Sequence, residues 1–96
     1  MLVITEKVPG GKLVRIKISV QKDTIETAQI TGDFFLHPED AIELLEKTVA
    51  GNPASISHIE LKQKLDETIT KNNLMLVGFS SDDIARMTTQ VLQVQK

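Results

Sequence analysis

The sequence changes character within residues 30–40, which read ITGDFFLHPED. Before this segment, apolar residues alternate with polar ones as in strands; after it, they recur every three or four residues as in helices. Gly32 allows a backbone turn that other residues disfavour, and Pro38 suits the first position of a helix. The segment also holds two of the three Phe residues in a chain without Trp or Tyr. It therefore predicts the end of a strand, burial of aromatic side chains and the start of a helix.

The residues before this segment predict three antiparallel strands. Residues 2–7 form a short β-branched run typical of an edge strand. Residues 12–20 alternate cleanly, so that one face would carry Val14, Ile16, Ile18 and Val20, and the other Arg15, Lys17 and Ser19. A strand with one apolar and one charged face suits an antiparallel sheet that is covered on one side only.

The turn after this second strand must keep the apolar faces of two strands together. Ala28 and Ile30 have to face the same side as Ile16 and Val14, and a two-residue loop would turn Ile30 toward the opposite face. We therefore predict a three-residue loop, residues 21–23, that pairs Ile16 with Ala28 and Val14 with Ile30. Asp23 would be left-handed, in the loop form that carries a bulge.

Three helices are predicted in the second part of the chain. The first spans residues 38–50, with His37 near its N-cap and Gly51 after its end. The second begins with a capping box at residues 57–60, Ser-His-Ile-Glu, and stops at the two Asn residues 72–73. These signals also place acidic residues in the first turns, where the helix dipole favours them.

The third helix is predicted to begin with Ser80 and Asp83 in the same capping arrangement. Residues 74–77, Leu-Met-Leu-Val, fit either a strand or an apolar connector; the connector is favoured because no alternation is visible. Each helix has an apolar stripe, formed in turn by Ala41, Ile42, Leu45 and Val49, by Leu61, Leu65 and Ile69, and by Ile84, Met87, Val91 and Val94.

Strands followed by helices, without alternation between them, indicate the α+β class. We predict a three-stranded antiparallel meander with about three helices packed on one face, in the order β-β-β-α-α-α. A chain of 96 residues is long enough for one domain and too short for two, so residues 1–96 are expected to form a single domain.

Composition excludes several functions. The formal net charge is −2, with 11 basic and 13 acidic residues, which argues against non-specific binding to nucleic acid or membranes. The absence of Cys excludes disulfides, thiolate chemistry and Cys-ligated metal. The sequence contains no recognisable signal peptide or membrane span, so the cytoplasm is the expected location.

Few residues are candidates for catalysis. His37 and His58 lie at predicted helix starts, where a capping or surface role explains them, and no His pair has the spacing of metal ligands. No Ser lies in a nucleophile elbow. We therefore predict no catalytic residue and no metal site in this chain, and an independent enzyme is disfavoured because no nucleophile–base pair is recognisable.

Two short segments could instead contact a partner. In Gly10-Gly11-Lys12, the glycines could expose backbone N–H groups to a phosphate beside a Lys charge, or form a plain mobile turn. Asp33 is either a solvated turn residue or a contact to a ligand or partner. Phe34 and Phe35 are adjacent at a strand end, so their rings should point opposite ways, one to the core and one to the surface or a partner.

The segments Lys7 to Arg15, KVPGGKLVR, and Ile30 to Pro38, ITGDFFLHP, resemble the accessory domain of lipoate–protein ligases. The resemblance covers nearly the whole chain and includes the acidic helix at 39–51. Because the chain starts at Met1 without a preceding catalytic domain, it is similar to the stand-alone small subunit of two-part ligases. The fold is expected to resemble that of iron–sulfur scaffold proteins, whose Cys-dependent function does not carry over.

The resemblance implies a non-catalytic accessory subunit. Its partner would be a catalytic subunit that activates lipoate with ATP and Mg to lipoyl-AMP and then lipoylates a Lys of an acceptor domain. The chain alone would bind no cofactor. Its partner-facing or active-site-facing residues would be Gly10, Gly11, Lys12, Asp33, Phe34 and Phe35. The alternative is a free-standing adaptor or carrier-binding module of the same fold.

Overall fold

The structure is a computed structural model and describes residues 1–8 and 10–93; Pro9 in the first loop and Val94 in the third apolar stripe lie outside the described residues. Its elements follow the chain as β1 (Leu2–Lys7), β2 (Leu13–Gln21), β3 (Thr24–Gly32), β4 (Phe35–His37), the 3-10 turn η1 (Glu39–Ala41), α1 (Ile42–Val49), α2 (His58–Lys71), β5 (Met75–Val77) and α3 (Ser81–Gln93). The predicted α+β class and the three-stranded antiparallel meander are confirmed.

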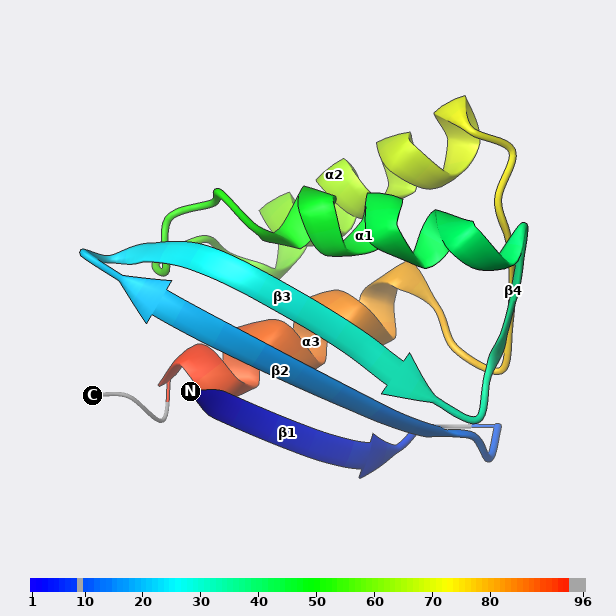
Figure 1. The fold of residues 1–96 in the computed structure, drawn as a ribbon, viewed down its shortest axis with the longest axis horizontal. Coiled ribbons are helices and arrows are strands. Elements are labelled where there is room, and N and C mark those ends of the chain that lie inside the picture. The colour runs from blue at the N-terminus through cyan, green and yellow to red at the C-terminus, as the bar shows by residue number, and fades with distance from the viewer. Residues whose placement is uncertain (9, 94–96) are drawn as a thin grey trace.

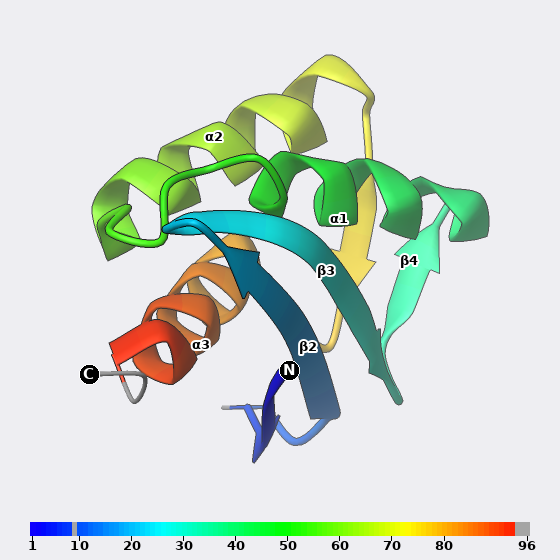
Figure 2. The same cartoon turned by 60° about the vertical axis from the view of Figure 1, so that its left-hand side comes forward.

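The helices cover one face of the sheet β1-β2-β3. In Figure 1 the strands run in front of α3, and α1 and α2 lie above them. Helix α3 packs against β1 and β2, α1 packs against β3, and α2 packs against both of the other helices. Figure 2 shows the sheet curving over α3, so that the strands and the helices enclose the core between them. No helix of the described residues covers the opposite face of the sheet, where Val3, Thr5 and Arg15 are exposed.

The alternation of β2 produces this arrangement. Val14, Ile16 and Ile18 face the helices and are at most 1% exposed, whereas Arg15 on the other face is exposed. The predicted core face of this strand is therefore confirmed. Burial of such side chains stabilises the fold by about 1.5–3 kcal/mol each.

The predicted three-residue hairpin loop is wrong. Gln21 pairs with Thr24 across a two-residue loop of Lys22 and Asp23, both of which have positive φ, 51° and 63°. Asp23 is thus left-handed as predicted. A two-residue turn with positive φ at both residues matches the right-handed twist of the flanking strands, which explains why it is preferred to a longer loop.

A β-bulge near the turn end of the β2–β3 ladder brings the apolar side chains of the two strands back to the same face of the sheet. The register shifts between Ser19 and Val20, after which Ile18 pairs with Ala28 and Ile16 with Ile30, instead of Ile16 with Ala28. The need for a one-residue correction was predicted from the apolar pattern. Its position was not, because a bulge inside the strand and an odd loop have the same effect on side-chain parity.

The predicted helix starts at residues 57 and 80 are confirmed. Ser57 Oγ accepts a hydrogen bond from Glu60 N at 3.2 Å. Ser80 Oγ accepts from Asp83 N at 3.2 Å, and Asp83 Oδ2 accepts from Ser80 N at 3.0 Å, which completes the reciprocal box. His37 ends β4 and precedes Pro38, the N-cap of η1, so it lies near the start of the first helical segment as predicted.

The favoured connector at residues 74–77 is wrong, because Met75 to Val77 form β5. This strand pairs antiparallel with β4 in a separate two-stranded sheet, with Leu36 opposite Leu76. The strand was the less favoured of the two alternatives for residues 74–77, and β4 was not predicted, since three residues are too few to show alternation and the partners are far apart in the sequence.

Gly32 lets the chain leave the sheet toward β4. A Cβ atom at this position would lie 2.1 Å from the carbonyl oxygen of Leu13, and the residue has φ +156°. Asp33 N donates to the same oxygen at 3.0 Å. No side chain fits between these two backbone segments.

We expect Gly32→Ala to lower the free energy of unfolding by about 2–4 kcal/mol, because the clash is with backbone that cannot move aside. Gly51→Ala is the matched control, since Gly51 also has positive φ but open space around it; its cost should be about 1–2 kcal/mol. Urea denaturation followed by circular dichroism measures both. Equal losses in the two variants would contradict the close-contact explanation.

Candidate functional site

Three segments that are distant in the sequence meet at one end of the molecule, on the right of Figure 1. These are the β1–β2 loop, the β3–β4 corner and the β5–α3 loop. The contacts that join them involve Lys12 with Gly78 and Phe34 with Phe79. Five of the six candidate residues from the sequence lie on the first two segments, and Phe35 begins β4 beside them.

The β1–β2 loop has a closed base and an open tip. Val8 N donates to Lys12 O, and Gly11 N donates to Val8 O, each at 2.9 Å. Gly10 and Gly11 have φ values of 100° and 103°, and a Cβ atom at either position would meet no atom within 4 Å. The glycines therefore allow this turn and leave its tip free for close approach by another surface.

The Lys12 side chain is held more tightly than its place in a glycine-rich loop predicts. Its side chain is half-buried, and its stem lies on Gly78, where an added Cβ atom would be only 2.4 Å from Lys12 Cγ. No ion pair within residues 1–8 and 10–93 includes Lys12. The stem is thus held by packing, while the ammonium group lacks an acidic partner in the part of the chain that the structure describes.

Phe34 and Phe35 have different surroundings, as predicted. The Phe34 ring is half-buried and stacks on Phe79, with centroids 4.0 Å apart and planes inclined by 23°. The Phe35 ring is 68% exposed. Asp33, between Gly32 and this pair, is also exposed.

The outward side of the β4–β5 ribbon is an exposed apolar surface, which we call the ribbon face. Phe35 pairs with Val77 and His37 with Met75, so these four side chains share one side, while Leu36 on the other side is buried. Met75 is 62% and Val77 49% exposed. The sequence did not indicate Met75 or Val77 as surface residues, because only the pairing with β4 brings them beside Phe35.

A shallow hollow of about 360 Å³ adjoins the ribbon face at the β3–β4 corner. Its walls come from the end of β3, the β3–β4 corner, β4, η1 and the start of α1: Ile30, Thr31, Gly32, Phe34, Phe35, Leu36, Glu39 and Ile42. The mostly apolar walls and their continuity with the ribbon face fit contact with another protein.

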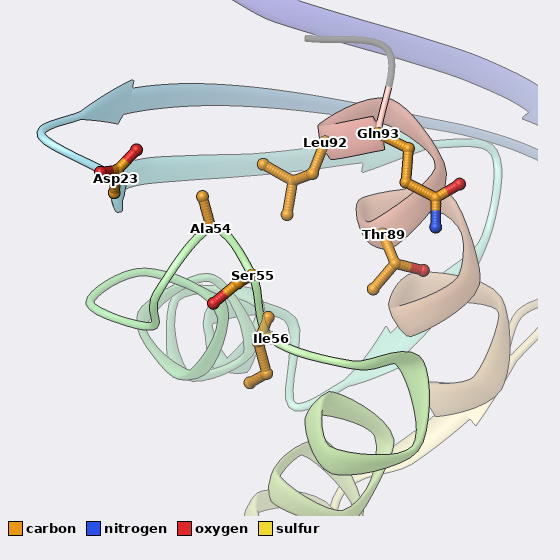
Figure 3. Close-up of a pocket in the computed structure, with 7 residues that line it drawn as sticks. All are labelled: Asp23, Ala54, Ser55, Ile56, Thr89, Leu92 and Gln93. Atoms are coloured by element: carbon orange, nitrogen blue, oxygen red, sulfur yellow. The ribbon is translucent and has the colours of Figure 1, made fainter. Parts of the chain in front are cut away.

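A larger pocket of about 560 Å³ lies at the opposite end of the sheet, beside the β2–β3 turn. Figure 3 shows its lining, which comes from Asp23, the 54–56 loop and the last turn of α3. Among the described residues that line it, only Asp23 is charged. In the described residues, no hydrogen bond joins the Asp23 carboxylate to the hydroxyl of Ser55 or Thr89, and the Thr89 hydroxyl donates to Ala85 O instead.

Several charged groups of α2 and α3 are held by contacts within the chain. Hydrogen bonds from Ser81 and, second, Lys62 lower the pKa of Asp66. The hydrogen bond to Glu6 raises the pKa of Arg86 and joins α3 to β1 at 2.6 Å. No three His, Asp or Glu residues that could hold a metal ion come together in residues 1–8 and 10–93.

His58 begins α2, and its Nε2 lies 2.9 Å from Oδ1 of Asp82 in the first turn of α3. This contact joins α2 to α3. Within the described ranges, no helix is both long and apolar enough to cross a bilayer.

These features define a class of protein: a small α+β module with an apolar surface and a glycine–lysine loop at one end. The family model for the bacterial lipoate protein ligase C-terminus matches residues 2–87. The chain therefore belongs to this family, as its resemblance implied. No curated protein matches the sequence.

The fold is similar to a chain in the structure of an archaeal lipoylation system, a bi-partite lipoate protein ligase and its E2 lipoyl domain from Thermoplasma acidophilum. The TM-score is 0.71 at 20% sequence identity, over 92% of this chain and 97% of that one. At this low sequence identity, the comparison shows that the two chains share a fold.

The two Phe residues should differ in their effect on stability. Phe34→Ala should lower the free energy of unfolding by about 2–3 kcal/mol, less than the ~3–5 kcal/mol of a fully buried Phe, because part of the ring is exposed. Phe35→Ala should change it by no more than about 0.5 kcal/mol. Thermal and urea unfolding check this, and a larger loss in Phe35→Ala would show that the ribbon face is part of the core.

Proposed function

We propose that this chain is the non-catalytic accessory subunit of a two-part lipoate–protein ligase. With a catalytic subunit that binds lipoate, ATP and Mg, it supports the formation of lipoyl-AMP, before the lipoyl group passes to a Lys of an acceptor domain. The observation that carries the proposal is an apolar ribbon face beside an open glycine–lysine loop, on a chain of the ligase C-terminal family.

The ribbon face is proposed to contact the catalytic subunit. Three of its four side chains are apolar and about half to two-thirds exposed: Phe35, Met75 and Val77. Contiguous exposed apolar side chains favour association, because burial removes them from water. Phe35 is the expected anchor, since aromatic side chains at the centre of an interface contribute most to affinity.

The glycine–lysine loop is proposed to face the nucleotide or acyl site during activation. Gly10 and Gly11 leave the loop tip open, and the packing of Lys12 on Gly78 directs its ammonium group without neutralising it. A positive charge meets developing phosphate charge most effectively where water is excluded. Exclusion of water would also protect an acyl-adenylate from hydrolysis.

The first experiment compares the pure chain with the chain plus a catalytic subunit. We expect no lipoate-dependent release of pyrophosphate from the chain alone and clear release from the pair, measured by an enzyme-coupled assay. Lipoate activation by the pure chain would overturn the accessory role. A chain that binds an acceptor domain but never the catalytic subunit would favour the adaptor alternative.

Phe35→Ala should weaken binding to the catalytic subunit roughly tenfold or more, because it removes the proposed anchor. Ile59→Ala is the matched control: Ile59 is also 68% exposed but lies on α2, away from the ribbon. Isothermal titration calorimetry gives both affinities. Equal effects of the two variants would remove the ribbon face from the interface.

Lys12→Met should slow lipoyl-AMP formation by the complex by about tenfold, since it keeps the apolar stem on Gly78 and removes the charge. Transfer from preformed lipoyl-AMP to the acceptor should stay near normal. Lys22→Met, in the exposed turn at the other end of the sheet, is the control. Equal slowing of both half-reactions by Lys12→Met would indicate a docking defect, and unchanged rates would leave Lys12 without a role.

A further inference from the structure

The two outer edges of the sheet β1-β2-β3 differ. The edge of β3 is occupied: Ile25 N donates to Asn52 O at 2.9 Å, Gly51 N donates to Ile25 O at 2.7 Å, and Ile30 N donates to Glu46 Oε2 at 2.8 Å. By contrast, β1 pairs with β2 alone within the described residues. The chain thus contacts one edge of its sheet with a loop and a helix side chain, and within the described residues it leaves the outer edge of β1 unpaired.

The backbone groups that point away from β1 can be identified. Val8 N donates to Lys12 O, so this pair is hydrogen-bonded. In an antiparallel ladder, hydrogen-bonded and non-bonded pairs alternate. The N–H and C=O groups of Lys7, Thr5 and Val3 therefore point outward, and together they can bind an added strand.

The core is incompletely covered along this edge. Leu2 and Ile4 lie on the helix-facing side, yet both are only half-buried. Their partners across the ladder, Ile18 and Ile16, are at most 1% exposed. A further strand with apolar residues on this side would cover Leu2 and Ile4.

The other side of the same edge is basic. Lys7, Arg15 and Lys17 lie on the open face, where their partners in the ladder include Thr5, Val3 and Gln29 and no carboxylate. The acidic residue of β1, Glu6, faces the helices and binds Arg86. Residues 1–22 hold five basic residues and one acidic residue, in a chain that is acidic as a whole. The charge around this edge therefore favours an acidic occupant.

We infer that the outer edge of β1 binds an extended acidic segment of a partner protein as a fourth strand. The segment would alternate apolar residues, packed on Leu2 and Ile4, with Asp or Glu residues beside Arg15 and Lys17. A second copy of the chain is disfavoured, because it would bring two basic edges together. The inference stands apart from the ligase proposal, since it uses only the strand edges and the charges around them.

The test uses the full chain, labelled with nitrogen-15, and an acetylated, amidated probe peptide of alternating Val and Asp/Glu, VDVEVDV. We expect the amides of Val3, Thr5 and Lys7 to become protected from hydrogen exchange, while the amide of Ile30 is unchanged. A peptide with Lys at the acidic positions should bind roughly tenfold more weakly. Affinity for the acidic peptide should fall as salt is raised.

Two variants locate the binding. Thr5→Pro removes an outward N–H group but no hydrogen bond to β2, so it should reduce affinity about tenfold or more while the fold is kept. The double variant Arg15→Gln and Lys17→Gln is a second test of the same edge that leaves the backbone unchanged. It should abolish the preference for the acidic peptide over the Lys peptide.

Several results would overturn the inference. The first is that the amides of β1 gain no protection at about 2 mM acidic peptide. The second is that protection appears only at amides outside β1, and the third is that the acidic and Lys peptides bind equally well. Protection of β1 that rises with protein concentration alone would assign the edge to a second copy. Stronger displacement of the peptide by single-stranded DNA or phosphatidylserine vesicles than by an acidic protein segment would assign the basic face to a different class of partner.

Discussion

The close approach of Gly32 to the carbonyl oxygen of Leu13 is the contact on which this structure depends. It brings the end of β3 against the start of β2 and lets Asp33 N bind the same oxygen. The chain can then turn out of the first sheet, place Phe34 on Phe79 and begin a second sheet with β4. A side chain at residue 32 would push these segments apart, because backbone lies on both sides of the contact.

The end of the molecule formed in this way combines rigid support with an open surface. Lys12 packs on Gly78 and Phe34 on Phe79, so the β1–β2 loop and the β3–β4 corner both rest on the β5–α3 loop. The ribbon face and the two glycines then remain exposed. An accessory subunit of a ligase would need this combination, since a docking surface loses less conformational entropy on binding when it is already ordered.

Sequence reasoning worked best where one local rule decides the outcome. Alternation along β2 placed Val14, Ile16 and Ile18 in the core, and the boxes at Ser57 and Ser80 marked two helix starts. It failed where two local solutions satisfy the same pattern. The hairpin needed a one-residue correction, and the chain makes it with a bulge at the step between Ser19 and Val20 and a two-residue turn in place of a longer loop.

The sequence by itself determined the class of the fold, the inward face of the main sheet and the different surroundings of Phe34 and Phe35. These follow from periodicity, capping and side-chain alternation, which act over a few residues. Only the tertiary structure decided that Met75 pairs with His37 and that Lys12 lies on Gly78. It also decided that, among the described residues, β3 has hydrogen-bond partners at its outer edge while β1 pairs with β2 alone. Each of these joins segments far apart in the chain, and no local pattern specifies which distant backbone a short apolar run or a long side chain will meet.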